Sequence, residues 1–236
     1  MVSTMRIAHV TATYPPHNTG TGNVARRNAL ELARRGHDVH VFTAAIPGAP
    51  VEERHDGVTI HRLRPAVRYG NAAFLPSLVT RLRRFELIHL HMPFYGGSEA
   101  IFLLKRLGRV PLVITHHQDV HLGGPAGLVN RLHDRLLGRR LMQHADRTCF
   151  TSLDYARASR FASLLRDGRA QVAELPNGVD PDFFTPGPRP AHLVEAYGLA
   201  GKQALLFVGV LDRAHYFKGV DNLLRAVAAL ADPNLA

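Results

Sequence analysis

The chain has 236 residues, a formal net charge of +10, 46% apolar residues and a single cysteine. This composition excludes a mainly disordered chain, an internal disulfide framework and a zinc site built from thiolates. No apolar run approaches the roughly 18 residues of a membrane span, and the first residues lack the pattern of a secretory signal, so we expect a cytoplasmic protein.

Short apolar runs alternate with amphipathic segments along residues 1–180, which predicts strands alternating with helices. The expected strands are residues 6–10, 39–43, 58–63, 87–91, 112–115, 147–151 and 172–175. The expected helices are residues 23–35, 71–84, 97–107, 128–144 and 153–165. This order is typical of parallel pairing in a doubly wound, Rossmann-like α/β sheet, whose ligands bind beyond the carboxyl ends of the strands.

A proline-rich segment from Thr185 to Pro190 marks a domain boundary, so residues 1–185 form the first predicted domain. A strand at 204–210 and a helix from 219 to about 231 follow. One strand and one or two helices are too little for an independent core. We therefore expect residues 186–236 to be a linker and the incomplete start of a second Rossmann-like domain.

Basic residues are concentrated in the middle of the chain. Residues 60–140 carry 13 lysines and arginines against four acidic residues, which is nearly the whole excess of positive charge. Such a zone attracts nucleic acid, anionic lipid or phosphorylated ligands, although an arginine-rich surface without a partner has the same composition. Within the zone, the stretch from Arg68 to Arg84 interleaves apolar and basic residues, and we expect it to be partly exposed near the mouth of the cleft. It is either a basic amphipathic helix that can rest on an anionic membrane or a plain surface helix.

The loop between the first strand and the first helix is the first candidate site. It contains Gly20 and Gly22, which let the backbone approach a ligand, and the following helix N-terminus offers N–H groups to a phosphate. The full glycine fingerprint of a dinucleotide-binding loop is incomplete here, so a plain strand-to-helix turn is the alternative.

The histidines, 15 in all, supply the second candidate site. Five of them lie in or just after two neighbouring predicted strands: His89, His91, His116, His117 and His121. The first two are two residues apart and face one side of the sheet. The cluster is compatible with a catalytic loop, with a metal site, or with histidines satisfied in the core or at the surface. We expect no metal, because the helical HExxH-type spacing is absent.

The third candidate lies between residues 207 and 219, where a predicted strand ends in a loop that carries Arg213 and Lys218. Two cations beside a helix N-terminus suit a diphosphate. Lys218 is one of only three lysines in the chain, and a solvated surface lysine is the alternative interpretation.

Taken together, these segments resemble glycosyltransferase family 4, whose members have the GT-B fold of two facing Rossmann-like domains. Five stretches carry the resemblance: Tyr14–Pro16 with its glycine loop, Arg35–Val39, Ile88–Pro93, Leu175–Asp180 and Phe207–Gly219. The resemblance implies a retaining enzyme that moves a sugar from a nucleotide-diphosphate sugar to a lipid, glycan or small-molecule acceptor. It implies no metal and no other cofactor. Residues 1–185 would be the acceptor-side domain and residues 186–236 the truncated start of the donor-binding domain.

The resemblance also assigns roles to residues. Gly20 and Gly22 would approach the phosphates of the donor, and His117 would lie at the reaction centre. Lys218 would clamp the diphosphate and stabilise the leaving group, a role that suits charge developing in the transition state. The family commonly has an arginine where Val210 stands here, and Arg213 is the residue we consider as its substitute.

The Glu-(seven residues)-Glu motif that holds the donor in this family lies beyond residue 236, so we expect little or no activity from this chain alone. A second chain or a missing C-terminal half would complete it.

Two other classes of function stay open. A Rossmann oxidoreductase needs an acid at the end of the second strand, where Phe42-Thr43-Ala44 stands. A non-catalytic scaffold would bind an anionic membrane or nucleic acid through the basic zone. Because the chain has no tryptophan, we expect no binding of nucleic acid. The remaining partner of such a basic zone is a membrane, which the protein would contact peripherally at its inner face.

Overall fold

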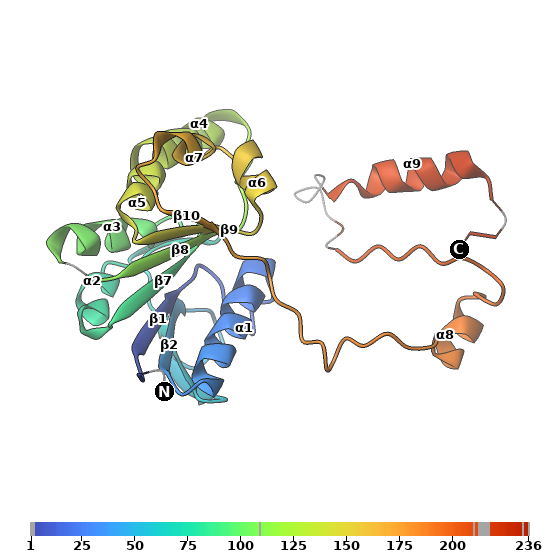
Figure 1. The fold of residues 1–236 in the computed structure, drawn as a ribbon, viewed down its shortest axis with the longest axis horizontal. Coiled ribbons are helices and arrows are strands. Elements are labelled where there is room, and N and C mark those ends of the chain that lie inside the picture. The colour runs from blue at the N-terminus through green and yellow to red at the C-terminus, as the bar shows by residue number, and fades with distance from the viewer. Residues whose placement is uncertain (1–2, 109, 210, 212–217, 233, 236) are drawn as a thin grey trace. The chain divides into compact units, whose positions relative to one another are not determined.

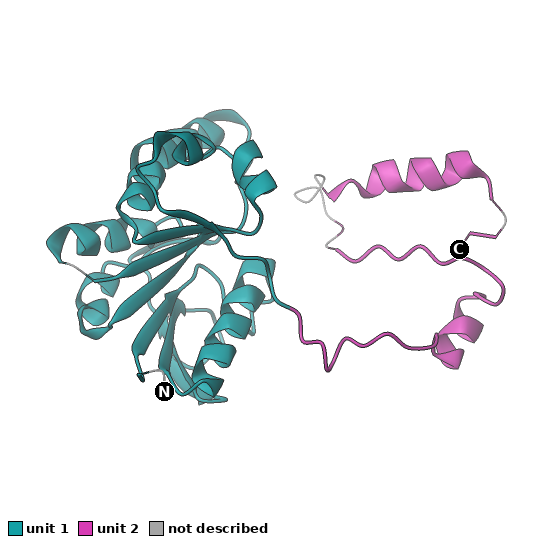
Figure 2. Cartoon of the chain, viewed as in Figure 1, with its two compact units in different colours: residues 1–178 teal, residues 179–236 magenta. Residues whose placement is uncertain are grey.

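The computed structural model describes residues 3–235 apart from residues 109, 210, 212–217 and 233. The chain divides into two compact units, residues 1–178 and residues 179–236 (Figure 2). The boundary between the units thus follows residue 178, a few residues before the boundary expected after residue 185 from the proline-rich segment. None of the described helices is long and apolar enough to cross a membrane.

Unit 1 is built on one eight-stranded sheet with the order β10-β9-β8-β7-β1-β2-β4-β3. Its strands are β1 (Arg6–Val10), β2 (Asp38–Ala44), β3 (Glu52–His55), β4 (Val58–Leu63), β7 (Leu87–Met92), β8 (Leu112–His116), β9 (Arg147–Phe150) and β10 (Val172–Glu174). All neighbours pair in parallel except the edge strand β3, which is antiparallel to β4. The order reverses between β1 and β7, which places a ligand-binding crevice of this fold class at their carboxyl ends. The predicted Rossmann-like α/β fold is confirmed.

Helices cover both faces of this sheet (Figure 1). They are α1 (Gly20–Arg34), α2 (Leu78–Arg81), α3 (Ser98–Leu107), α4 (Gly124–His133), α5 (Arg139–His144), α6 (Leu153–Ala158) and α7 (Ser163–Asp167). A 3-10 turn, Leu82–Arg84, follows α2, and a π-helical turn, Asp134–Gly138, joins α4 to α5. One core lies between α1 and strands β2 and β4, and the larger core lies on the opposite face.

The expected helix at residues 71–84 is wrong in its first half. Ala72–Phe74 forms β6, which pairs with β5 (Val67–Tyr69) in a separate two-stranded sheet, and the helix begins only at Leu78. Pro76 explains the late start, because proline cannot donate within a helix and disfavours helical backbone at the residue before it. The apolar residues expected on a free amphipathic face, Leu75, Leu78 and Leu82, are fully buried in the core.

Unit 2 contains α8 (Ala191–Ala196) and α9 (Val220–Leu230), and α9 confirms the helix expected from residue 219. The expected strand at 204–210 is wrong for its described part, residues 204–209, which is not β structure. The nearest pairing is an isolated bridge between Gln203 and Leu235. A strand needs hydrogen-bonded neighbours, and the described residues of this unit offer only that bridge.

Candidate functional site

The first helix begins at Gly20, three residues before its expected start, because Thr19 caps it. The Thr19 hydroxyl oxygen accepts a hydrogen bond from the Gly22 N–H at 3.1 Å. A Cβ atom on Gly20 would meet nothing within 4 Å, whereas one on Gly22 would lie 2.8 Å from the Thr13 carbonyl oxygen. Gly20 is thus open at the helix N-terminus, and close packing against Thr13 accounts for Gly22 without a ligand.

The buried Arg62 holds the loop that leads into this helix. Its side chain is 1% exposed, and its guanidinium donates to the carbonyl oxygens of Pro15 at 2.9 Å and Pro50 at 3.0 Å. It also pairs with the Glu53 carboxylate at 2.6 Å. In the sequence Arg62 is one of the 13 basic residues of the central zone, and no local signal sets it apart as a buried anchor.

Three histidines form a hydrogen-bonded chain that ends at His117. His9 Nδ1 lies 3.0 Å from His91 Nε2, and His91 Nδ1 lies 3.0 Å from His117 Nε2. The rings are stacked, with interplanar angles of 26° and 8°. The β1–β7 register places His9 opposite His89, which separately contacts the Thr115 hydroxyl at 2.8 Å. Sequence reasoning missed His9, although it is the fourth residue of the first predicted strand.

Burial keeps these imidazoles neutral. It lowers the pKa of His9 and of His117 to about 4. Burial, together with the neighbouring imidazoles, lowers the pKa of His89 and His91 well below the ordinary value. At pH 7 each ring therefore carries one N–H and one lone pair, so His117 is a neutral hydrogen-bonding group.

His9, His89 and His91 also bring three nitrogen atoms within 4.8 Å of one another, which is the spacing of a possible metal-binding group. The histidine chain competes with that use. Both nitrogens of His91 and one nitrogen of His9 already take part in hydrogen bonds to other imidazoles. A metal would have to break these bonds, and the absence of a metal stays a prediction.

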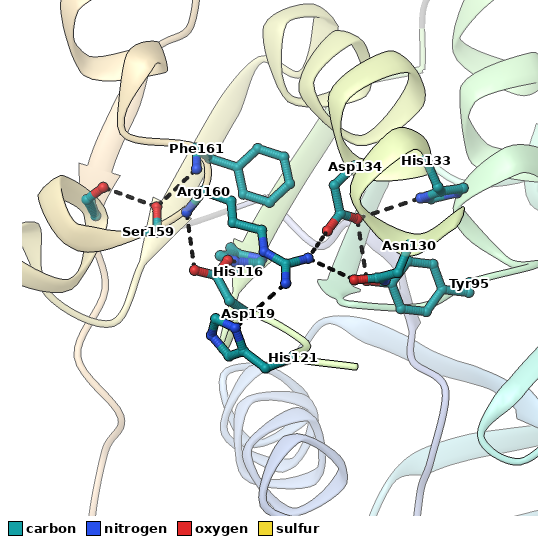
Figure 3. Close-up of polar contacts among 11 residues, drawn as sticks. Tyr95, His116, Asp119, His121, Asn130, His133, Asp134, Ser159, Arg160 and Phe161 are labelled. Atoms are coloured by element: carbon teal, nitrogen blue, oxygen red, sulfur yellow. Dashed lines mark hydrogen bonds and ion pairs between the residues drawn. The ribbon is translucent and has the colours of Figure 1, made fainter. Parts of the chain in front are cut away.

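A charged network runs from His116, the last residue of β8, through Asp119 and Arg160 to Asp134 (Figure 3). His116 Nε2 contacts the Asp119 carboxylate at 3.1 Å, and Asp119 also accepts from the Arg160 backbone N–H at 3.0 Å. The Arg160 guanidinium donates to Asn130 at 2.6 Å and to Asp134 at 3.1 Å. Arg160 lies in a break between α6 and α7, where one helix was expected. The break lets its backbone and side chain tie the loop after β8 to the π-helical turn.

At the far end of this network, His133 is held between two carboxylates. Its Nε2 lies 2.9 Å from Glu99 and its Nδ1 lies 3.5 Å from Asp134. Burial alone would lower the pKa of His133, but the bonds to Asp134 and Glu99 outweigh it and raise the pKa to about 9. The imidazolium of His133 is therefore charged at neutral pH, in contrast to the neutral chain behind His117.

The predicted site residues are distributed over both units. Gly20, Gly22 and His117 belong to unit 1 and lie at the carboxyl edge of one sheet. Lys218 belongs to unit 2 and is exposed just before α9. Arg213 lies outside the described residues. Their roles toward a ligand stay predictions.

A cavity of about 320 Å³ lies away from this edge, near the beginning of β1. Its lining includes Arg6, His40, Arg81 and Arg84. Part of the basic zone therefore gathers around this cavity rather than around His117.

The family model of glycosyltransferase family 4 matches residues 18–183, most of the chain. This chain belongs to glycosyltransferase family 4. The resemblance noted from the sequence is thus confirmed.

A D-inositol 3-phosphate glycosyltransferase of Nocardiopsis dassonvillei is 33% identical, over 98% of this chain and 59% of the relative. A GDP-mannose-dependent alpha-mannosyltransferase of Mycolicibacterium smegmatis is 31% identical, over 88% of this chain and 56% of the relative. The chain therefore spans less than two thirds of the curated relatives it matches.

Solved structures show the same fold. HepE of Anabaena, crystallised in complex with UDP-glucose, superposes with a TM-score of 0.63 at 16% identity, over 98% of this chain and 59% of that protein. An alpha,alpha-trehalose-phosphate synthase (UDP-forming) from Burkholderia vietnamiensis gives a TM-score of 0.58 at 19% identity, over 99% of this chain and 64% of that protein. At these identities the likeness concerns the fold alone.

Proposed function

We propose that this chain is part of a retaining glycosyltransferase, which moves a sugar from a nucleotide-diphosphate sugar to a lipid, glycan or small-molecule acceptor without a metal or other cofactor. The observation that carries the proposal is the pairing of an open Gly20 at the N-terminus of α1 with His117 after β8, on one edge of a family 4 sheet. Relatives named for GDP-mannose and a neighbour crystallised with UDP-glucose support the donor class.

In the proposed reaction, the bond between the anomeric carbon and the diphosphate oxygen breaks, and the nucleoside diphosphate leaves with the electron pair. The acceptor oxygen bonds to the anomeric carbon from the same face, and its proton passes to the leaving diphosphate. His117 hydrogen-bonds the sugar close to the anomeric carbon. Lys218, with Arg213 as the second candidate, offsets the charge of the leaving group, while Gly20 lets backbone N–H groups reach the phosphates.

The proposal is tested in the whole protein that carries this chain, with a panel of UDP- and GDP-sugars and analysis of the anomeric product. His117→Ala should lower the turnover number by about 10²-fold or more, the scale expected when one hydrogen bond to a transition state is removed. His91→Ala should cost less, and the exposed His55→Ala serves as the matched control. Turnover of His117→Ala within a few-fold of the control would contradict the assignment.

We also propose that the 236-residue chain has little or no transferase activity by itself, because it spans only 59% and 56% of the two curated relatives described above. A second chain or a C-terminal half would supply the rest. Purified chain and whole protein should be compared at equal concentration with the same donors. Transfer or donor hydrolysis by the chain alone at the rate of the whole protein would overturn this part.

Peripheral contact with the inner face of an anionic membrane is a second proposal, and the β5–β6 hairpin carries it. Tyr69 is 84% exposed, and Val67 and Phe74 are exposed beside it. Arg68 lies between them and donates to the Ala45 carbonyl oxygen at 2.6 Å. An exposed aromatic hairpin with a cation suits the interface of an anionic bilayer.

Flotation with vesicles that contain or lack an anionic lipid tests this contact. The chain should float with the anionic vesicles, and Tyr69→Ser combined with Phe74→Ser should reduce the bound fraction. Val51→Ser removes a comparably exposed apolar side chain elsewhere and should leave it unchanged. Equal flotation with both vesicles would reject the contact.

A further inference from the structure

The histidine chain fixes which nitrogen of His117 is free for a ligand. His117 Nε2 faces His91 at 3.0 Å, and among the described residues no hydrogen bond to His117 Nδ1 is found. The ring is only partly buried. A ligand at the sheet edge therefore meets the Nδ1 side of the ring.

A chain of neutral imidazoles has two possible proton arrangements. In each arrangement every ring donates in the same direction, because each neutral ring has one N–H and one lone pair. If the rings donate inward, His117 Nδ1 is a lone pair and His9 Nε2 carries a hydrogen. If they donate outward, from His9 through His91, then His117 Nδ1 carries the hydrogen and His9 Nε2 is a lone pair.

The inner end of the chain decides between the two arrangements. His9 Nε2 is buried and has no hydrogen-bond partner among the residues that the structure describes. Among backbone groups, a buried N–H without an acceptor is rarer than a buried carbonyl oxygen without a donor, and we apply the same preference to this imidazole. The outward arrangement is therefore favoured, because it leaves a lone pair rather than a hydrogen at His9 Nε2.

We propose that His91 and His9 are positioning residues, which set the tautomer of His117 so that its Nδ1–H points to the ligand side as a neutral donor. The tautomer is a property of this chain alone, and only the identity of the ligand rests on the proposed function. That ligand is a hydrogen-bond acceptor, for which a sugar hydroxyl or ring oxygen qualifies. A group that can only donate would find no partner there.

The proton positions can be measured in the 236-residue chain with nitrogen-15-labelled histidine, by long-range proton–nitrogen correlation of the imidazole rings. The wild-type chain should show His117 with its hydrogen on Nδ1. His91→Leu removes the donor to His117 Nε2, and the ring should shift toward the Nε2–H tautomer that free histidine prefers in water. His91→Asn has nearly the same size as leucine but keeps an N–H donor, and should restore the wild-type tautomer.

His89→Leu is the matched control, because His89 lies on the same strand and the same face as His91 but outside the chain. It should leave the His117 tautomer unchanged. In the whole enzyme, His91→Leu should lower the turnover number about 10-fold with little change in KM, and His91→Asn should recover most of it. This scale is that of partners that orient metal-bound histidines, taken by analogy.

Three results would overturn the inference: a wild-type His117 with its hydrogen on Nε2, an unchanged tautomer in His91→Leu, or stoichiometric zinc that shifts the His9 and His91 resonances. The wild-type spectrum decides even where His91→Leu fails to fold. If the tautomer behaves as expected but His117→Ala retains its turnover, the positioning of His117 stands and the proposed catalytic role falls.

Discussion

The positive charge of His133 should contribute to stability through its contacts with Glu99 and Asp134. The side chain is 19% exposed and lies between Glu99 and Asp134, at the junction of α4 with the π-helical turn. His133→Gln keeps the size of the side chain nearly unchanged and removes the positive charge. Glu99 then loses the cation beside it, whereas Asp134 keeps its ion pair with Arg160 at 3.1 Å.

The magnitude follows from the pKa of His133, which rises from 6.5 to about 9 on folding. At about 1.4 kcal/mol per pKa unit this corresponds to roughly 3.5 kcal/mol, and residual solvent screening reduces it to about 2–3 kcal/mol. Because the folded-state pKa is the higher one, the contribution is fully present below pH 6.5. It is lost as the pH rises through about 9.

Urea denaturation of the wild type and His133→Gln between pH 6 and pH 10 measures this contribution. The difference in unfolding free energy between the two proteins should be largest near pH 6 and shrink by about 2–3 kcal/mol toward pH 10. Other titrating groups are common to both proteins and cancel. His55→Gln, an exposed histidine beside Asp56, should show a small difference at every pH. A wild-type minus His133→Gln difference that stays constant from pH 6 to pH 10 would refute the reasoning.

Two further substitutions test the packing behind the candidate site, each by urea denaturation. Gly22→Ala should lower the unfolding free energy by about 1–3 kcal/mol, because its Cβ would press against the Thr13 carbonyl oxygen. Gly20→Ala should leave it unchanged or raise it by under about 1 kcal/mol, and equal losses at both glycines would contradict the geometry. Arg62→Met should cost about 2–4 kcal/mol, since three acceptors lose a charged donor. Arg62→Lys should recover less than half of that loss, because a point charge cannot replace the planar fork, and full recovery would argue against it.

The sheet could be predicted from the sequence because each buried strand carries its own local signal. Apolar runs such as residues 87–91 and 112–115 stand between amphipathic segments, and their order alone implies parallel pairing. The edge strand β3 has no such signal, since Glu52–His55 is polar and mostly exposed. The spacing of Leu75, Leu78 and Leu82 is helical, but Pro76 and the pairing of Ala72–Phe74 with β5 prevent a helix before Leu78.

The site was only half predictable, because its polar contacts join residues that are far apart in the chain. His89 and His91 could be placed on one face from their spacing, whereas His9 joins them only through the β1–β7 register. His133 and Glu99 are separated by 34 positions, and Arg160 and Asp119 by 41. No local pattern announces such pairs, since each partner alone resembles an ordinary polar surface residue.

The end of β8 separates two opposite electrostatic environments. His116, its last residue, contacts the Asp119 carboxylate, which also accepts the Arg160 backbone N–H, while the next residue, His117, ends a chain of neutral imidazoles. His117 follows the last residue of β8 directly, so the two groups of contacts meet at one point of the chain. For His117 to stay a neutral donor, its environment must disfavour protonation of the ring. The loop after β8, which carries His117, must also be held in place by contacts with the rest of the unit. The buried chain supplies the first, and the adjacent His116 adds to it, because burial and then His116 lower the pKa of His117. The charged network supplies the second, because Asp119 ties the loop after β8 to His116 and to the Arg160 backbone.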